Sequence, residues 1–579
     1  MRNLPWWQAV PLTVAAAALL VAGWRLFWFL TDDAFIAFRY ASNAMAGRGL
    51  VWNPEPFLPV EGYSSFLWVV LLLAIWKATG VPPPESANVL SLLFGAGTLV
   101  LAASLVMRTR LPASWRAYRF PLLAAALAGI LLNRTFLAWL SSGLETALFE
   151  FLLLAWIALV LGGATAGPPA VSARRELPWA LALSATAALA ALARPDGLLA
   201  VAATPLVLLL PDGRDPAASS GWRKLRWRRA LWGSLPLAAV AAHLLWRRSF
   251  YGAWLPNTHA AKVVEPWPEA GLYYGASFAV ENGLWLWAVL AAAAALRSIS
   301  GRGGLASAGA GRRARVALVA AVLLAHAGYY LGVVGGDHFE YRVLSHLVPL
   351  AFVSAVALLP RVTASPRLGL GLLLALVAVS LPIQWLHWDE TRQRTTREET
   401  FQMAAPVAHR FPPPLRQAVA RWDRWQAWLQ ARSVGARQQE HKVLYEALRE
   451  RLPSREEGAG IPWGERPVNA TTGVGMIGWI LPDVAVIDLH GLNDRVIARN
   501  PVSAERRARR VMAHDRRPPP GYVECFRPNV SARGLRVVPR KIPLTDEDIV
   551  ACEAGAWRGR GRIRPPGPPA RGLSRGPES

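Results

Sequence analysis

Two adjacent acids, Asp32 and Asp33, stand directly after an apolar segment at residues 6–30. That segment is long enough to cross a bilayer, which takes roughly 20 apolar residues. The two carboxylates are therefore expected at a membrane surface, where charged groups are costly and mark function. A helix cap needs only one carboxylate. The pair is thus the first candidate for general base chemistry, or for binding a hard cation through oxygen ligands.

The composition indicates a protein that crosses the membrane several times. Of the 579 residues, 53% are hydrophobic and only 17% are charged. A soluble chain of this length would alternate polar and apolar stretches across several domains. The first apolar segment lacks a small-residue cleavage site, so we expect it to remain as a signal anchor. Apolar runs recur at 6–30, 64–79, 88–107, 119–133, 145–163, 178–193, 197–211, 231–249, 275–296, 316–334, 346–360 and 367–386.

The net charge of +25 has a membrane explanation rather than a nucleic-acid one. Arginine and lysine concentrate in short segments between apolar runs, at residues 108–119, 214–229 and 297–315. This pattern is typical of the positive-inside rule, which assigns these three loops to the cytoplasm.

The charge rule and the apolar runs conflict unless one run stays out of the bilayer. If all of them crossed, Asp32 and the basic loop 108–119 would lie on the same side. Segment 64–79 is the best candidate for an interfacial helix, because it is short, contains Lys77 and is rich in Trp and Phe. The alternative is a miscounted pair at 178–193 and 197–211. Without segment 64–79, about eleven spans remain, and the acid pair and everything after residue 387 lie outside.

Residues 387–556 are polar and predict a small soluble α/β domain on the outer face. An amphipathic helix is expected near 437–452, and the β-branched run 482–488 is typical of a buried strand. Cys525 and Cys552 both lie in this domain, and an oxidising compartment favours a disulfide between them, with two free thiols as the alternative. The tail at 557–579 is rich in Arg, Pro and Gly, so we expect it to be disordered.

Most other polar motifs fall on the outer face under this topology. Guanidinium and ammonium groups suit phosphate, whereas amides, carboxylates and aromatic faces suit sugar hydroxyls. The candidate substrate-binding residues are Arg39, Tyr40, Asn43, Glu61, Tyr63, Glu145, Arg194, Asp196, Arg247, Arg248, Asn257, Thr258, His259, Lys262, Asp337, His338, Arg342, His490 and Asp494.

Several of these candidates also have a purely structural interpretation. Arg247 and Arg248 break the charge rule at the outer end of a span, so they bind a lipid phosphate or snorkel to headgroups in general. Residues 194–197 could form only a turn, with Asp196 as a helix cap. Glu145 and Asp337 could likewise cap helices, and His338 and His490 could be solvated imidazoles.

The order of the outer motifs resembles that of integral-membrane GT-C glycosyltransferases, and in particular the mycobacterial-type terminal β-(1→2)-arabinofuranosyltransferases. Each block alone is weak, but their order and joint presence are specific. The resemblance does not cover the tail after Cys525. The similar blocks are residues 32–41 (DDAFIAFRYA), 49–53 (GLVWN), 60–68 (VEGYSSFLW), 142–146 (SGLET), 193–197 (ARPDG), 256–258 (PNT), 335–337 (GGD) and 488–494 (DLHGLND).

The resemblance implies a GT-C catalytic domain at 1–386 in the inner (plasma) membrane. Such an enzyme moves a sugar, here best matched by arabinofuranose, from a polyprenyl-phosphate donor to a cell-envelope glycan on the outer face, with inversion. An acid of the first outer loop removes the acceptor proton; Asp32 is preferred and Asp33 is second. Lys262 and Arg342 are favoured for the leaving phosphate. A divalent cation stays open, because nothing completes a ligand set.

Rival membrane functions fit less well. A transporter would show midplane charges and internal repeats, and we find no repeat. A polysaccharide polymerase or ligase, or a transferase of another lipid-linked sugar to lipopolysaccharide or O-antigen, would leave similar motifs. In a transferase, Asp32, Asp196, Lys262 and Asp337 should line one outer cavity; if they scatter, the transferase hypothesis fails.

Overall fold

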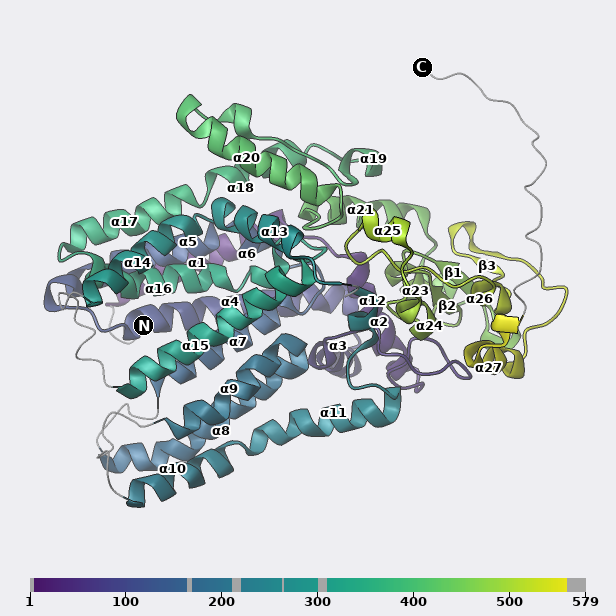
Figure 1. Ribbon diagram of the computed structural model, residues 1–579, viewed down its shortest axis with the longest axis horizontal. Coiled ribbons are helices and arrows are strands. Elements are labelled where there is room, and N and C mark those ends of the chain that lie inside the picture. Colours follow the sequence, from purple (N-terminus) through teal and green to yellow (C-terminus); the bar gives the residue numbers. More distant parts are fainter. Residues whose placement is uncertain (1–4, 164–168, 211–219, 263–264, 300–309, 560–579) are drawn as a thin grey trace.

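The chain folds into a helical bundle with its C-terminal third covering one end (Figure 1). The computed structural model describes residues 5–163, 169–210, 220–262, 265–299 and 310–559. Most of the tail expected to be disordered, residues 560–579, lies outside the described residues, as do residues 211–219 and 300–309 of two basic loops.

All of the expected apolar segments are helical. Proline begins several of them, at the first-turn positions where its missing N–H costs nothing. They correspond to α1 (Trp6–Leu26), α3 (Phe66–Thr79), α4 (Pro83–Arg108), α5 (Arg119–Leu131), α7 (Thr146–Gly162), α8 (Pro169–Ala193), α9 (Leu198–Leu209), α11 (Ala238–Tyr251), α13 (Pro268–Glu281), α14 (Leu284–Ile299), α15 (Ala310–Gly328), α16 (Leu347–Val362) and α17 (Pro366–Val379), with α10 (Ser220–Gly233) before α11.

The helices that carry the expected spans differ in length. Within the described residues, six helices are long and apolar enough to cross a membrane, or seven if α13 and α14, bent by 84°, form one span. Other expected spans fall on shorter helices, among them α5, α7, α9 and α11 with 13, 17, 12 and 14 residues. The backbone between α13 and α14 breaks at Gly283, where φ is +65°. The chain is a multi-pass membrane protein in either count.

Helix α3 is the counterpart of segment 64–79. Its 14 residues reach about 21 Å at 1.5 Å per residue, whereas the hydrocarbon core is about 30 Å thick. Helices α5, α9 and α11 are as short, with 13, 12 and 14 residues, so the interfacial position of α3 stays a prediction.

The outer part begins inside a helix, because α18 (Pro382–Thr391) runs through the expected boundary at 387. The expected helix near 437–452 and the expected strand in 482–488 are both present, as α21 and β2. The outer elements are α19 (Arg397–Thr400), α20 (Pro413–Gln430), α21 (Gln438–Arg451), α22 (Arg455–Gly458), β1 (Val468–Thr471), α23 (Gly475–Ile480), β2 (Ala485–Asp488), α24 (Arg495–Arg499), α25 (Ala504–Ala508), α26 (Tyr522–Cys525), β3 (Val530–Ser531), β4 (Arg536–Val537) and α27 (Asp546–Ala554).

The strands of this part form two small sheets. β1 pairs in parallel with β2, and β3 pairs antiparallel with β4. Cys525 of α26 and Cys552 of α27 form a disulfide, with their Cα atoms 5.9 Å apart. The bridge lies in a buried apolar cluster that also contains Tyr522, Phe526 and Ile549.

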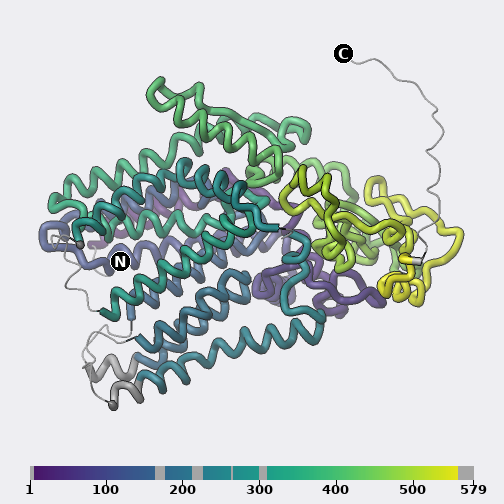
Figure 2. Tube along the Cα trace, viewed as in Figure 1, coloured from purple at the N-terminus to yellow at the C-terminus, as the bar shows by residue number. Residues whose placement is uncertain are grey.

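The outer part shares a hydrophobic core with the first outer loop. Helix α2 (Asp32–Met45) packs on α23, and the Trp479 ring lies 6.5 Å from Phe35 and 6.2 Å from Phe38. These side chains belong to one continuous buried cluster. In Figure 2 the purple N-terminal loop accordingly lies against the green and yellow C-terminal segments. The expected outer domain is thus joined to the membrane part by its packing.

A buried ion network also joins the two parts. Arg437, directly before α21, pairs with Glu281 of α13 at 3.0 Å and with Glu340 at 2.8 Å. Glu340 also pairs with Arg134 of α6 (Arg134–Ala138), and all four side chains are at most 2% exposed. Removing one partner from such a network leaves an uncompensated buried charge.

We expect Arg437→Met to lower the free energy of unfolding by about 3–5 kcal/mol, because it leaves Glu281 buried without a cation and Glu340 with Arg134 alone. The matched control is Arg392→Met, which removes a half-exposed ion pair with Asp389 and should cost no more than about 1 kcal/mol. Thermal unfolding of the purified protein in detergent, followed by tryptophan fluorescence, compares the two. Equal melting shifts would contradict this role of the network.

Candidate active site

Asp32 begins α2 and is held by the outer part of the chain. Its carboxylate accepts hydrogen bonds from the backbone N–H groups of Gly475, at 3.1 Å, and Met476, at 2.8 Å. Burial outweighs these bonds and, with the nearby Asp33 charge, raises the pKa of Asp32 to about 6. The result is an oriented carboxylate whose pKa suits a general base at neutral pH.

Gly475 is required by this contact. A Cβ atom at position 475 would lie 1.7 Å from the Asp32 carbonyl oxygen, whereas a Cβ at Gly473 would meet nothing within 4 Å. Strand β1 ends at Thr471, so a glycine-rich turn leads from a strand into α23 and presents its first N–H groups to the acid. The candidate residues from the sequence do not include Gly475 and Met476, which hold Asp32. The succession of a strand, two glycines and a helix was the sequence pattern that could have predicted them.

Asp33 faces a lysine. Its carboxylate lies 3.8 Å from the Lys262 ammonium at the end of α12 (Asn257–Lys262). Asp33 and Lys262 are 31% and 27% exposed, so both remain accessible to a ligand. Figure 1 places α2, α12 and α23 together where the bundle meets the outer part.

Four histidines lie on one side of this pair. The His338 ring centroid is 5.5 Å from His441 and 5.1 Å from His514, which in turn is 4.7 Å from His490. Burial lowers the pKa of His338 well below its usual value and that of His441 to about 4. Both rings are therefore neutral at pH 7. His441 and His514 were missed because a single histidine in a polar segment carries no spacing pattern.

A second charged group lies next to the histidines. The Arg194 guanidinium binds Glu145 at 3.2 Å and Asp196 at 2.7 Å, and Arg342 binds Asp337 at 2.8 Å. Arg342 also interacts electrostatically with Arg194. The turn expected at 194–197 is present as the 3₁₀ turn η2 (Pro195–Gly197), but the Asp196 and Glu145 side chains pair with Arg194 and do not cap helices.

The histidines and the Asp33–Lys262 pair are linked to the charged group around Arg194 and Arg342. His338 directly follows Asp337, and its main-chain N–H donates to Asp337 Oδ1 at 2.9 Å. Lys262 acts electrostatically on His338. The structure thus places Asp32, Lys262, Asp337 and Asp196 along one set of charged and imidazole groups. None of the four lines either of the two best-defined cavities in the described part of the chain, so the shared outer cavity expected of a transferase stays a prediction.

Arg39 occupies a different position from the one expected of a substrate ligand. It is 1% exposed, and its guanidinium donates to the carbonyl oxygens of Trp52, Gly478, Leu481 and Val484 at 2.5–2.9 Å. With its donors used inside the protein, it joins α2 to the segment around α23 and has none directed to a ligand.

Tyr40 and Asn43, on the same helix, are also fully occupied. The Tyr40 hydroxyl donates to the Val60 carbonyl at 2.6 Å and accepts from the Gly62 N–H at 2.8 Å. The Asn43 amide donates to the Val51 carbonyl at 2.8 Å. These two motif residues fold the first outer loop and are not directed to a substrate.

Arg247 no longer contradicts the charge rule, because it forms a buried ion pair with Glu61 at 2.7 Å. Burial raises the pKa of Glu61 to about 7, against the effect of Arg247. Tyr63 lies beside this pair, its hydroxyl 3.2 Å from that of Tyr251. Arg248 is exposed and donates to the Gly252 carbonyl at 2.6 Å.

The remaining candidates connect α12 to the outer part. The Asn257 amide donates to the carbonyls of Gly491, at 2.8 Å, and Asp494, at 3.1 Å. Asp494 caps α24, and His490 contacts Arg517 at 2.9 Å. Thr258 is half-buried and His259 is exposed on the same short helix. Asn257 and Asp494 therefore position Lys262 indirectly.

Metal ligands are not apparent in the part of the chain that the structure describes. There, no group of three or more His, Cys, Asp or Glu side chains is placed to hold a metal ion. The arrangement supplies an oriented carboxylate, an accessible cation and polar side chains, which suits transfer of a group from a phosphate leaving group.

Comparison with known proteins agrees with this geometry. No family model matches the chain. A terminal β-(1→2)-arabinofuranosyltransferase of Corynebacterium glutamicum is 29% identical over 68% of this chain, which spans 58% of that protein. ArnT of Cupriavidus metallidurans, solved with undecaprenyl phosphate, aligns over 88% of this chain and 90% of its own, with a TM-score of 0.52 and 12% identity. The chain has a GT-C fold.

The resemblance noted in the outer motifs is thereby confirmed at the level of fold. The oligosaccharyltransferase of Archaeoglobus fulgidus aligns over 83% of this chain with a TM-score of 0.42, too low to carry an argument. Within this GT-C chain, the acid pair directly follows the first long helix, as the resemblance implied.

We expect Gly475→Ala to lower the melting temperature and to reduce whatever activity depends on Asp32. The new Cβ would displace the Asp32 backbone, and such overpacking costs about 1–3 kcal/mol. Gly473→Ala, two residues earlier with open space around it, should change neither property. Thermal unfolding of the two variants tests this; a stable Gly475→Ala protein would contradict the close approach.

Proposed function

We propose that the chain is a GT-C glycosyltransferase that moves a sugar, arabinofuranose, from a polyprenyl phosphate to a hydroxyl of a cell-envelope glycan, with inversion. The observation that carries this proposal is the amide-held Asp32 beside the accessible Asp33–Lys262 pair. The arabinofuranosyltransferase relative supports the sugar, and the undecaprenyl phosphate bound to ArnT supports the carrier.

The reaction needs one base and one site for negative charge. Asp32 accepts the proton of the acceptor hydroxyl while that oxygen bonds to the anomeric carbon. The bond from the anomeric carbon to the phosphate oxygen breaks at the same time, and its electron pair leaves on the polyprenyl phosphate. A positioned base of this kind contributes about 10²–10⁴-fold in rate.

The contact between Asp33 and Lys262 supports Asp32, rather than Asp33, as the base in this proposal. In an inverting displacement, the acceptor and the leaving phosphate lie on opposite faces of the anomeric carbon. Lys262 stabilises the phosphate, so Asp33, which touches Lys262, lies on the phosphate side. Asp32 is then the base, and its two amide bonds keep it oriented while lone pairs remain for the acceptor proton.

The second charged group has a supporting role in this proposal. Arg342 and Arg194 are each paired with acids, so their net field is smaller than that of two free cations. They suit recognition of sugar hydroxyls and the far side of the phosphate through bidentate contacts. The proposal locates the site on the outer face of the inner (plasma) membrane, which agrees with the disulfide in the outer part.

A transferase of another sugar, acting on a lipopolysaccharide or O-antigen acceptor, is the second candidate. The undecaprenyl phosphate bound to ArnT supports a polyprenyl-phosphate carrier without specifying the sugar. Turnover with a panel of polyprenyl-phosphate sugars and synthetic acceptors separates the two. Transfer of a hexose but not of arabinofuranose would overturn the sugar proposed here.

We expect Asp32→Asn to reduce kcat by about 10²–10⁴-fold with little change in KM for the donor, because it removes the base. Asp33→Asn should act mainly through Lys262, with a smaller loss of rate and a raised donor KM. Initial rates with a defined polyprenyl-phosphate sugar give both constants. Retained activity in both variants would sink the assignment of the acid pair.

The raised pKa of Asp32 predicts the pH dependence. A base must be deprotonated, so kcat/KM should be constant above the pKa and fall tenfold per unit below it, with the limb near pH 6. An unperturbed carboxylate would place the limb near pH 4. A pH profile on the wild-type enzyme distinguishes them, and a limb near 4 would contradict Asp32 as the buried base.

A further inference from the structure

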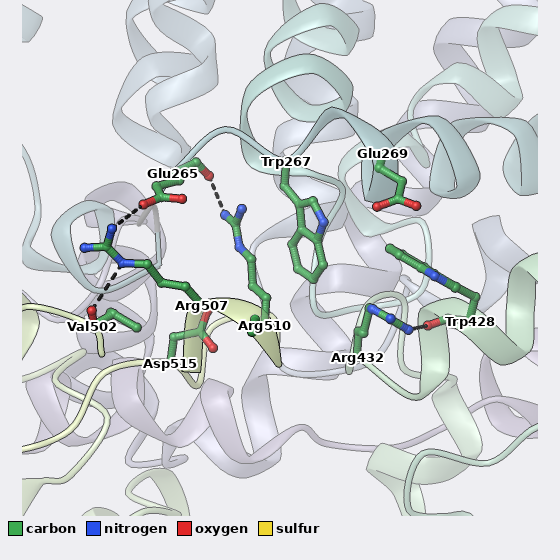
Figure 3. Close-up of a pocket in the computed structure, with 10 residues that line it drawn as sticks. Glu265, Trp267, Glu269, Trp428, Arg432, Val502, Arg507, Arg510 and Asp515 are labelled. Atoms are coloured by element: carbon green, nitrogen blue, oxygen red, sulfur yellow. Dashed lines mark hydrogen bonds and ion pairs between the residues drawn. The ribbon is translucent and has the colours of Figure 1, made fainter. Parts of the chain in front are cut away.

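A separate cavity of about 290 Å³ is lined by residues from three parts of the chain (Figure 3). They are the segment before α13 with the first turn of α13, the C-terminal end of α20, and residues 502–515 around α25. The cavity volume is near the lower end for small-molecule sites, which begin at roughly 300 Å³. It is large enough for one or two sugar rings but not for a folded partner.

The wall of this cavity combines acceptors and donors in equal number. Three carboxylates and three guanidinium groups line it: Glu265, Glu269, Asp515, Arg432, Arg507 and Arg510. The carboxylates disfavour binding of an anion, and the guanidinium groups disfavour binding of a cation. Both kinds of group disfavour an apolar tail, because contact with it would remove their charges from water. Arg507 pairs with Glu265 at 3.0 Å and Arg510 donates to the Glu265 carbonyl (Figure 3), so part of the wall is already neutralised. A neutral polyol suits this mixture of groups, since each hydroxyl donates and accepts.

Two indoles complete the wall. The Trp267 side chain points into the space between Arg510 and Trp428 in Figure 3, and the two ring centroids are 6.1 Å apart. Arg510 lies over Trp267 at 4.4 Å and Arg432 over Trp428 at 4.0 Å. Aromatic faces beside fixed hydrogen-bonding groups suit the C–H face and hydroxyl edge of a sugar.

The cavity adjoins the proposed centre through two connections. Glu265 follows Lys262 by only three residues along the chain. Asp515, 8% exposed, follows His514, whose ring lies 5.1 Å from His338 in the imidazole group next to Asp33. The proposal below requires an acceptor glycan that extends from the cavity past His514 and His338 toward the acid pair.

We propose that this cavity binds a sugar residue of the acceptor glycan, away from the hydroxyl that reacts. The proposal rests on the function proposed above and adds that the affinity for the acceptor depends on the length of the acceptor. An acceptor too short to reach the cavity gains nothing from it, whereas a longer one gains affinity without any change in the chemical step.

The test uses the full-length protein with polyprenyl-phosphate arabinofuranose and two acceptors, an arabinofuranose disaccharide and a hexasaccharide. We expect the wild type to have the lower KM for the hexasaccharide. Trp428→Ala and Glu269→Gln should each raise the hexasaccharide KM by about tenfold relative to the disaccharide KM, at constant kcat. The control, Trp425→Ala, alters a tryptophan of the same helix that stacks on Tyr273 and does not line the cavity.

Two results would overturn the proposal: wild-type KM values independent of acceptor length, or variants that affect both acceptors equally. Direct titration of the hexasaccharide into the protein without donor separates this proposal from the proposed function. Binding that Trp428→Ala or Glu269→Gln abolishes, in a protein that transfers no arabinofuranose, supports the cavity and contradicts the reaction. No binding at millimolar hexasaccharide contradicts the cavity.

Discussion

The structure depends on one set of polar contacts between the two ends of the chain. Arg39 donates to three carbonyl oxygens at residues 478–484, and Asp32 accepts from the N–H groups of residues 475 and 476. These groups are buried, so each would be costly without its partner. The same contacts hold α2 on α23, bury the aromatic cluster around Trp479 and fix the direction in which the acid pair points.

A polar residue in a sequence motif therefore does not show by itself whether it binds a substrate or stabilises the fold. The sequence was sufficient to find the helical segments, the strand at β2, the paired cysteines and the neighbourhood of the acid pair. It was not sufficient to separate Arg39, Tyr40 and Asn43 from true ligands, because a guanidinium that binds carbonyls and one that binds phosphate are the same residue. Only the partner tells them apart, and the partners of Arg39 lie in the last quarter of the chain.

A backbone break was hidden within one expected span for a related reason. Hydropathy follows composition and does not locate breaks in the backbone. The run 275–296 is apolar throughout, but its helices α13 and α14 bend by 84° at their junction. That bend leaves Glu281 at the end of α13, where it meets Arg437. The break thus supplies one anchor of the buried ion network between the bundle and the outer part.

The distance along the chain between Asp32 and its partner amides, 443 residues to Gly475, has a consequence for biosynthesis. At roughly 5–20 residues per second, the ribosome needs about 20–90 s to make the intervening chain. During that interval the first outer loop has already been inserted, but Asp32 lacks its amides and Arg39 lacks most of its carbonyls. A nascent or truncated chain that ends before Gly475 consequently cannot orient Asp32 through these contacts.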